Sequence, residues 1–155
     1  MIELYFEDFP VGEVIEFGDV AVTAESIVEY AREFDPQPFH LDAEAARDTQ
    51  AGELIASGWH TAALVMRMCC DAFVLRSASN GGPGVEELNW LTPVRPGDRL
   101  RVRRTTTSGR PSKSRPGLGL VGFQLAAVNQ RDETVMTLTI TMMMGRRPLA
   151  EAAPW

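Results

Sequence analysis

Residues 58–77, GWHTAALVMRMCCDAFVLRS, form the most apolar stretch of the 155-residue chain. An apolar run of this length can cross a membrane, but Arg67 and Asp71 interrupt it at the spacing of an ion pair on one helix face. Ser57 is suited to cap the helix, and Gly58 permits a close approach at its first turn. A helix that is apolar on nearly all sides is buried inside a protein. The stretch therefore predicts a long central helix enclosed by the rest of the fold.

After the Gly- and Pro-rich segment 80–84, the pattern changes to the two-residue alternation of strands. Strands are expected at residues 85–91, 99–107, 118–129 and 133–144, with one more within residues 11–22. A sheet that must bury one apolar helix curls around it. The sequence thus predicts an α+β fold, a single domain over residues 1–147 in which an antiparallel sheet wraps a long central helix. Residues 148–155 are expected to be a flexible tail.

A second helical region precedes the central helix. Thr23 can cap a helix that runs to Phe34 with apolar residues at helical spacing. The two prolines in residues 35–40, DPQPFH, then predict an irregular and stiff segment. Asp42 can cap a further short helix that stops near Gly52.

The composition excludes several classes of protein. The chain is 45% hydrophobic and 23% charged, which is ordinary for a globular domain and not for a disordered, collagen-like or membrane protein. The first residues lack the basic and apolar regions of a signal peptide. Cys69 and Cys70 are adjacent and poorly placed to bridge, as in proteins of a reducing compartment. A cytoplasmic protein is expected, with no metal and no cofactor, because two His and two adjacent Cys give no ligand spacing.

The net charge of −6 is unevenly distributed. Residues 1–53 hold 14 acidic and 2 basic side chains, whereas residues 54–155 hold 7 acidic and 13 basic ones. This balance disfavours nucleic-acid binding. Within the second half, loop 109–117, GRPSKSRPG, gathers Arg110, Lys113 and Arg115, which could grip a phosphate. The alternative is an ordinary solvated hairpin loop.

Two places have residues suited to catalysis. Asp35 and His40, held in the proline-braced segment, could form a general acid–base pair. The alternative is a structural loop in which Asp35 bonds the backbone and His40 packs. At the start of the central helix, the free N–H groups near Gly58 could stabilise a carbonyl oxygen that gains negative charge. The alternative there is simply a capped helix start, and His60 is expected to be structural or to line a pocket.

Three segments together resemble the MaoC-like dehydratase family, the (R)-specific enoyl-CoA hydratases with the hot-dog fold. They are DPQPFH at residues 35–40, IASGWHT at residues 55–61 and LTPVRPGD at residues 91–98, and the resemblance covers roughly residues 5–147. It implies reversible hydration of trans-2-enoyl thioesters to (R)-3-hydroxyacyl thioesters in fatty acid metabolism, without a cofactor. It also implies a homodimer or higher oligomer, with the acyl tunnel near the subunit interface. The charge balance and the composition described above predict no nucleic-acid or membrane partner. The substrate would be a thioester of CoA or of an acyl-carrier protein.

The resemblance also assigns roles to residues. Asp35 and His40 match the catalytic pair that activates one water, with Asp35 the favoured proton acceptor, and Gly58 N–H matches the donor to the thioester oxygen. We expect the substrate to be bound by Gln37, Phe39, Ser57 and Trp59, and its phosphates by Arg110, Lys113 and Arg115.

Two positions depart from the family pattern. Gln37 stands where the family usually has Asn, and Phe39 is bulkier than the usual aliphatic residue. If the amide at position 37 orients the water or Asp35, a misplacement by one methylene could cost on the order of 10²-fold in rate. Two alternatives therefore stay open, a hot-dog thioesterase and a non-catalytic acyl-thioester-binding or structural subunit of a heterodimeric dehydratase.

Overall fold

The apolar stretch forms helix α4, Gly58–Ala72, in the computed structural model, which describes residues 1–148. The predicted cap is confirmed, because the Ser57 hydroxyl oxygen accepts a hydrogen bond from the Trp59 N–H. The helix ends at Ala72, before the end of the apolar stretch, with Phe73 as its C-cap, and a short 3₁₀ helix, η2 (Val74–Arg76), follows it. Of the tail expected at residues 148–155, only Pro148 lies within the described residues.

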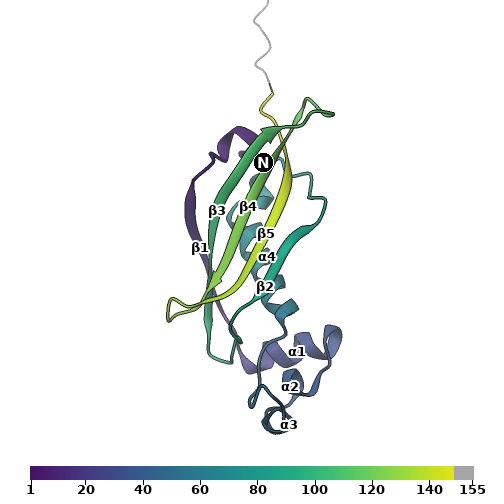
Figure 1. Ribbon diagram of the computed structural model, residues 1–155, viewed down its shortest axis with the longest axis vertical. Coiled ribbons are helices and arrows are strands. Elements are labelled where there is room, and N and C mark those ends of the chain that lie inside the picture. Colours follow the sequence, from purple (N-terminus) through teal and green to yellow (C-terminus); the bar gives the residue numbers. More distant parts are fainter. Residues whose placement is uncertain (149–155) are drawn as a thin grey trace, which may run out of the picture.

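The segments with the two-residue alternation of strands form one five-stranded antiparallel sheet in the order β1-β3-β4-β5-β2 (Figure 1). The strands are β1 (Val14–Ala21), β2 (Val85–Trp90), β3 (Arg99–Pro111), β4 (Leu118–Val128) and β5 (Thr134–Gly145). A 3₁₀ helix, η1 (Phe6–Asp8), precedes them. The α+β architecture predicted from the sequence, an antiparallel sheet on a central helix, is therefore confirmed. Strand β3 is longer than predicted, so residues 109–111 of the basic loop belong to a strand.

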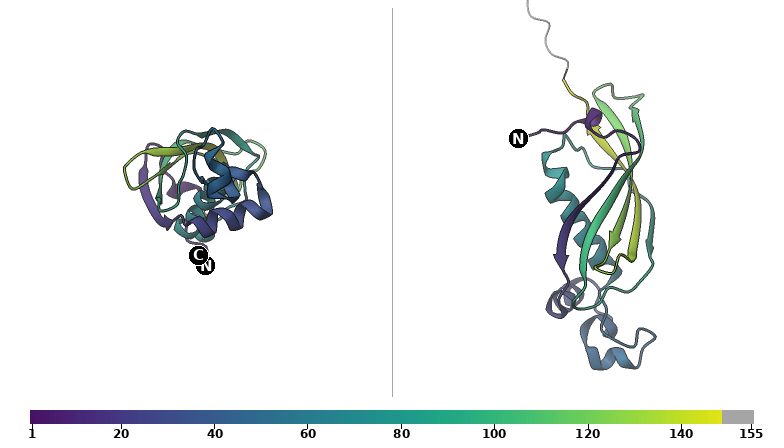
Figure 2. Two further views of the ribbon diagram at one scale, coloured as in Figure 1. Left: turned by 90° about the horizontal axis from the view of Figure 1, so that it is seen from below. Right: turned by 90° about the vertical axis from the view of Figure 1, so that its left-hand side faces the viewer.

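The core lies between the sheet and α4, which crosses one face of the sheet (Figure 2). Val65 and Cys69 of the helix and Val102, Phe123 and Met136 of the sheet are almost completely buried. Removing apolar side chains of this size from water stabilises the fold by about 1.5–3 kcal/mol each. This layer fixes the helix relative to the sheet and so fixes the position of its first turn.

The sheet covers only one side of α4 within a single chain. Trp59 is 58% exposed and Met66 46% exposed, and Ala63 between them is also exposed. The prediction of a helix enclosed on all sides is therefore correct for one face only, because five strands curl around one side of the helix and leave the other open.

Three helices lie at one end of the sheet (Figure 1): α1 (Ala24–Phe34), α2 (Pro38–Leu41) and α3 (Ala43–Arg47). The predicted caps are present, since Thr23 accepts from the Ser26 N–H and Asp42 accepts from two N–H groups of α3. Residues 38–41 are helical rather than irregular, because Pro38 occupies the first helical position, where its missing N–H costs no hydrogen bond. The next helix ends at Arg47 and not near Gly52.

Within residues 1–148, no helix has the length and apolar character needed to cross a membrane.

Candidate active site

A cleft of about 360 Å³ lies where the first turn of α4 meets α2 and the end of β2. Its polar wall comes from the segment before α2, and its apolar wall comes from the end of β2 and the segment that follows. The lining residues that the sequence had singled out are Asp35, Gln37, His40, Gly58 and Trp59. The structure therefore gathers the acid, the imidazole and the helix start around one space.

Asp35 and His40 face each other across 3.4 Å between the carboxylate Oδ2 and the imidazole Nε2. The other ring nitrogen, Nδ1, lies 2.7 Å from the Ile55 carbonyl oxygen. A carbonyl oxygen only accepts hydrogen bonds, so Nδ1 must carry a proton. In the neutral ring Nε2 then has its lone pair toward the carboxylate. Two acceptors, His40 Nε2 and Asp35 Oδ2, then face each other. Either a proton on Nε2 that is donated to the carboxylate or a water that donates a hydrogen bond to each atom satisfies both.

The carboxylate of Asp35 is held at both oxygens. The Ser57 hydroxyl donates to Oδ2 at 2.7 Å, and the Gln37 side-chain amide donates to Oδ1 at 2.7 Å. Burial by itself raises the pKa of Asp35, but these two hydrogen bonds and the nearby His40 outweigh it and bring the pKa below its ordinary value. Asp35 is therefore an oriented anion near neutral pH.

Gln37 thus hydrogen-bonds Asp35, the carboxylate that the shorter Asn of the family was expected to orient. Its extra methylene does not prevent the amide from bonding Asp35. The departure at position 37 therefore leaves the carboxylate with an amide donor.

The first turn of α4 is coupled directly to Asp35. The hydroxyl of Ser57 donates to the carboxylate while its oxygen accepts from the Trp59 N–H at 3.2 Å. Ser57 is fully buried behind Asp35 and so positions the carboxylate rather than lining the cleft. The N–H groups of a first helical turn have no acceptor within the helix, and the Gly58 N–H makes no hydrogen bond among residues 1–148.

Gly58 is also required by packing. A Cβ at this position would lie 2.6 Å from Cδ2 of the Trp90 indole. The Trp90 ring therefore rests directly on the backbone of the helix start, and it contacts Trp59 edge to face with 5.1 Å between the ring centroids. Any side chain at position 58 must displace the ring that forms one wall of the cleft.

Sequence reasoning missed the residues contributed by β2 and the segment after it, Trp90, Leu91, Thr92, Pro93 and Val94, and the deeper Thr61 and Val135. Residues 91–98 are one of the three segments that resemble the family, but no role in the site was expected for them. A pairing between β2 and β5, far apart in sequence, brings this segment to the cleft.

Phe39 and His60 do not line the cleft within the described residues. Phe39 packs against the His40 ring, with 4.4 Å between centroids, and lines an adjacent hollow. His60 is buried and stacks on Tyr30 at 4.7 Å, and its burial lowers its pKa. Of the two expectations for His60, the structural one fits this placement.

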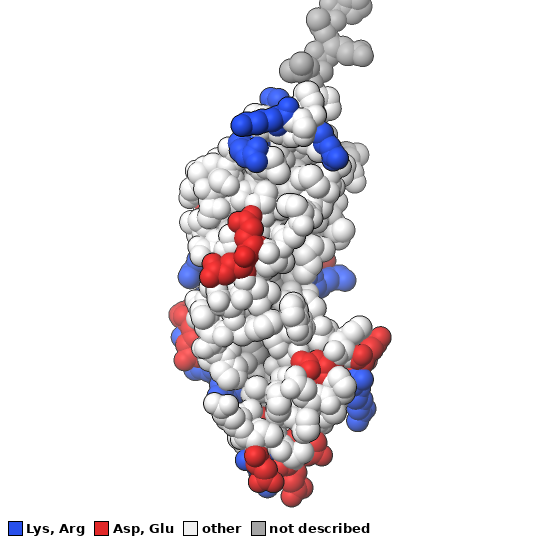
Figure 3. Space-filling model, turned by 45° about the vertical axis from the view of Figure 1, so that its right-hand side comes forward, with Lys and Arg blue, Asp and Glu red and all other residues white. Residues whose placement is uncertain are grey.

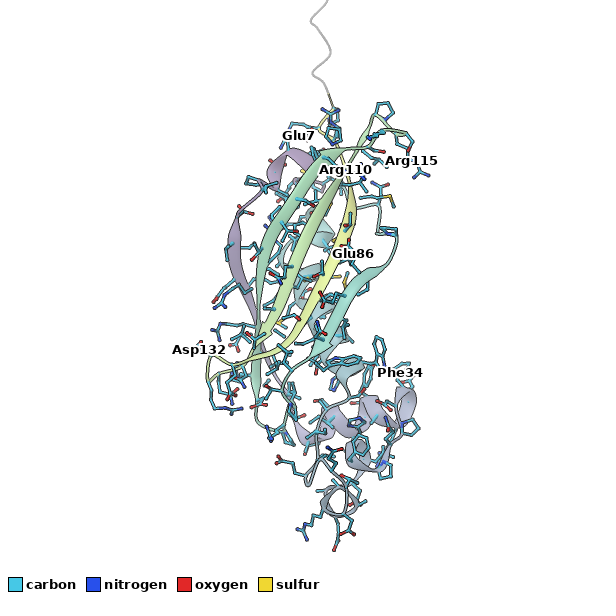
Figure 4. The ribbon with its side chains drawn as sticks, viewed as in Figure 1. Glu7, Phe34, Glu86, Arg110, Arg115 and Asp132 are labelled. Atoms are coloured by element: carbon cyan, nitrogen blue, oxygen red, sulfur yellow. The ribbon has the colours of Figure 1, made fainter. Side chains whose placement is uncertain are left out.

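The basic loop is far from the cleft in the same chain, contrary to the expectation that it meets the phosphates of a substrate held there. Figure 4 shows Arg110 and Arg115 at one end of the molecule and Phe34, the last residue of α1, at the other. The reason is topological, because β3 runs the full length of the sheet and carries the loop away from α1.

A family model and a solved structure name the same family. Residues 8–123 match the model of a family described as MaoC like domain. The crystal structure of a MaoC-like dehydratase from Rhodospirillum rubrum superimposes with a TM-score of 0.87 at 46% identity, covering 95% of this chain and all of that chain. YdeM of Bacillus subtilis is 25% identical over 140 residues, which cover 90% of this chain and 98% of YdeM. Mesaconyl-CoA hydratase of Cereibacter sphaeroides is 35% identical over 71 residues, 46% of this chain but only 20% of that protein.

Proposed function

The chain belongs to the MaoC-like domain family, and from that premise we propose that it is a hydratase that adds water reversibly to trans-2-enoyl-CoA thioesters, giving (R)-3-hydroxyacyl thioesters. The observation that carries the proposal is the convergence of Asp35, His40 and the Gly58 N–H on one cleft. The relatives named as a dehydratase and as an acyl-CoA hydratase support the same class of reaction.

Water activation follows from the two facing acceptors. A water that donates one hydrogen to Asp35 Oδ2 and the other to His40 Nε2 has its oxygen lone pairs free to attack C3 of the substrate. Because donors stabilise Asp35 as an anion, His40 is the better proton acceptor, which reverses the preference drawn from the sequence. The hydroxide adds to C3, and the proton held between His40 and Asp35 is delivered to C2.

Charge develops on the thioester oxygen as C3 is attacked, because the electrons of the double bond move toward the carbonyl. The Gly58 N–H would donate to that oxygen, and the positive end of the α4 dipole adds to the stabilisation. Removing a donor of this kind costs about 10²–10³-fold in rate in other enzymes. The small cleft, with Trp59 and Trp90 in its wall, favours a short acyl group.

The proposal is tested by mixing the purified protein with crotonyl-CoA and following loss of the conjugated-thioester absorbance, with chiral analysis of the product. We expect enzyme-dependent loss of absorbance and the (R)-3-hydroxy product. Release of free thiol, detected with a thiol reagent, would instead identify a thioesterase. Tight acyl-CoA binding without either reaction would identify a non-catalytic subunit.

Replacement of Ser57 with Ala tests how the helix cap controls the carboxylate. The variant loses a donor that stabilises the anion, so the pKa of Asp35 rises toward its ordinary value. Hydration requires the ionised carboxylate, and we therefore expect the acid limb of the kcat/KM profile to move to higher pH. Loss of the cap should also lower stability by about 0.5–2 kcal/mol.

Thr23→Ala is the matched control, because Thr23 caps α1 in the same way and makes no contact with Asp35. Its stability should fall by a similar amount, while its pH profile should stay at the wild-type position. An acid limb that shifts equally in both variants would assign the effect to general destabilisation.

Gly58→Ala tests the packing of Trp90 on the helix start. The new Cβ must displace the indole from its position, and we expect kcat/KM for crotonyl-CoA to fall about tenfold or more, as small misplacements at a site do. In Trp90→Ala the same Gly58→Ala change should cost much less, because nothing opposes the Cβ. The four measurements form a double-mutant cycle. Equal costs in both backgrounds would show that Trp90 is not the obstacle.

A further inference from the structure

His60 is a buried imidazole that the proposed mechanism does not use. The residue is only 6% exposed, and its Nδ1 atom has no hydrogen-bond partner among residues 1–148. A buried polar atom without a partner lowers the stability of a fold. Hydrogen bonding by Nδ1 therefore does not account for the imidazole at this position.

The contact that the imidazole does make is with Tyr30 of α1. The two rings are nearly parallel, with 9° between their planes and 4.7 Å between their centroids. Tyr30 is itself partly buried and packs against Phe34, with 5.0 Å between those centroids. Aromatic rings stacked at such a distance attract each other beyond the effect of the area they bury. The stack thus joins the second half of α1 to the first turn of α4.

No charged side chain in the described part of the chain acts on the His60 ring. Figure 3 shows acidic and basic side chains on the surface of the helical end of the molecule. Burial is nevertheless the one cause that lowers the pKa of the buried imidazole. The ring is therefore neutral near pH 7 and packs on Tyr30 as an uncharged aromatic surface.

Each of the stacked rings is close in the chain to a group of the cleft. Asp35 is the C-cap of α1, and its N–H donates to the Ala31 carbonyl oxygen at 3.0 Å. Burial and then the charge of Asp35 raise the pKa of the Tyr30 phenol, so the carboxylate and this ring are near neighbours. On the other helix, Gly58 precedes His60 by two residues. A displacement of α1 relative to α4 would therefore move the carboxylate relative to the Gly58 N–H.

A single side-chain hydrogen bond acts on the same distance. The Ser57 hydroxyl donates to Asp35 Oδ2 at 2.7 Å, and no other side-chain hydrogen bond among residues 1–148 joins α1 or its C-cap to the start of α4. A hydrogen bond weakens steeply once its donor and acceptor are displaced from a narrow range of distance and angle. The bond therefore depends on a packing contact that keeps the two helices together.

We propose that His60 and Tyr30 are positioning residues of the active site. Their stacked rings hold the end of α1 against the start of α4 and so keep Asp35 within hydrogen-bond reach of Ser57. The same contact sets the distance between the carboxylate and the Gly58 N–H. The inference rests on the proposed function and assigns no proton transfer to His60, whose ring does not line the cleft.

Two replacements at position 60 separate the ring from its nitrogens. His60→Phe keeps a flat ring, so kcat and KM for crotonyl-CoA should both stay within about twofold of the wild type. His60→Leu is equally apolar, but its branched side chain cannot lie flat on Tyr30. We expect its kcat to fall about tenfold or more, because small misplacements of reacting groups cost rate, while KM changes far less. Equal kcat values in the two variants would overturn the inference.

Tyr30→Leu removes the other ring and should lower kcat to the same extent. Once either ring is absent the remaining one has no stacking partner, so the variant with both changes should be no slower than the single variants. Losses that multiply in the double variant would show that the two rings act separately, and would overturn the inference.

Met68→Ala is the matched control for a general loss of stability. Met68 is buried on α4 two turns beyond His60, packs against Gly18 of β1 and does not line the cleft. The cavity left by this change should lower Tm, while kcat should stay at the wild-type value. A fall in kcat equal to that of His60→Leu would assign the effect to destabilisation and would contradict the proposal.

The pKa of the Asp35 carboxyl, measured by NMR titration, separates this inference from the proposed function. The titratable groups that face the carboxylate are His40 of α2 and Tyr30 of α1, and both remain in the position 60 variants. In His60→Leu the hydrogen bond from Ser57 should be lost, so the pKa of Asp35 should rise, whereas in His60→Phe it should not change. A rise confined to folded His60→Leu supports the inference even where no thioester is hydrated. An unchanged pKa in that variant overturns it even where hydration is observed.

The same titration in a Ser57→Ala background tests how the stack acts. The hydrogen bond to Asp35 is already absent there, so adding His60→Leu should raise the pKa of the carboxyl no further. A second rise of the same size would show that His60 acts on Asp35 by a route other than Ser57, and would overturn the proposal.

Discussion

Replacement of Asp35 with Asn is expected to lower kcat/KM for crotonyl-CoA hydration by about 10²–10⁴-fold, the contribution typical of one general acid–base group. The neutral amide cannot hold the attacking water as an anion does, and it leaves the imidazolium of His40 without its counter-charge. One of its two positions now carries an NH₂ group, which faces the donors on Ser57 or Gln37. The carboxylate is therefore not replaceable by a group of the same shape.

Asp42→Asn is the matched control for this variant. Asp42 is a nearby carboxylate that caps α3, does not line the cleft, and can be replaced by Asn because Asn is an equally good cap. We expect the control to keep its full activity and both variants to retain the wild-type circular dichroism spectrum. If folded Asp35→Asn hydrates crotonyl-CoA within about threefold of the wild type, Asp35 is not an acid–base group.

Two replacements of His40 separate its anchoring from its chemistry. In His40→Asn the side-chain amide can occupy the place of Nδ1 and still donate to the Ile55 carbonyl, but the group at Nε2 is lost. In His40→Gln the amide extends toward the place of Nε2, and the anchoring hydrogen bond is lost instead. Because neither amide is a base, both variants should lose about 10²–10⁴-fold in kcat/KM.

Stability distinguishes the two His40 variants. His40→Asn keeps the anchoring hydrogen bond and should unfold near the wild-type temperature, whereas His40→Gln should be less stable by about 0.5–1.5 kcal/mol, the net value of one hydrogen bond. Substantial hydration by His40→Asn would show that the ring serves only to hold Ile55. That result would remove His40 from the proposed mechanism.

Local features of the fold could be predicted from the sequence because their causes are local. The cap at Ser57 and the apolar run after it define the start of α4, and the cap at Thr23 defines α1. The short helix α2 was missed because Pro38 suggests interruption, whereas a proline at the first helical position is well tolerated.

The acid–imidazole pair could be proposed from the sequence because six consecutive residues contain both groups. The wall formed by Trp90 could not, because it depends on β2 pairing with β5 across about fifty residues of chain. The same long-range topology carries Arg110 and Arg115 to the opposite end of the molecule from Asp35. Strand order, which side-chain patterns do not encode, thus decides which charged groups a cleft can use.

The fate of water oxygen tests the central claim most directly. Crotonyl-CoA is incubated with the wild-type protein in water enriched in heavy oxygen, and the products are analysed by mass spectrometry. The account predicts that the label enters the C3 hydroxyl of an intact (R)-3-hydroxyacyl thioester and that Asp35→Asn and His40→Asn suppress its entry. Label found in the carboxylate of a released acid, or no enzyme-dependent label at C3, would contradict it.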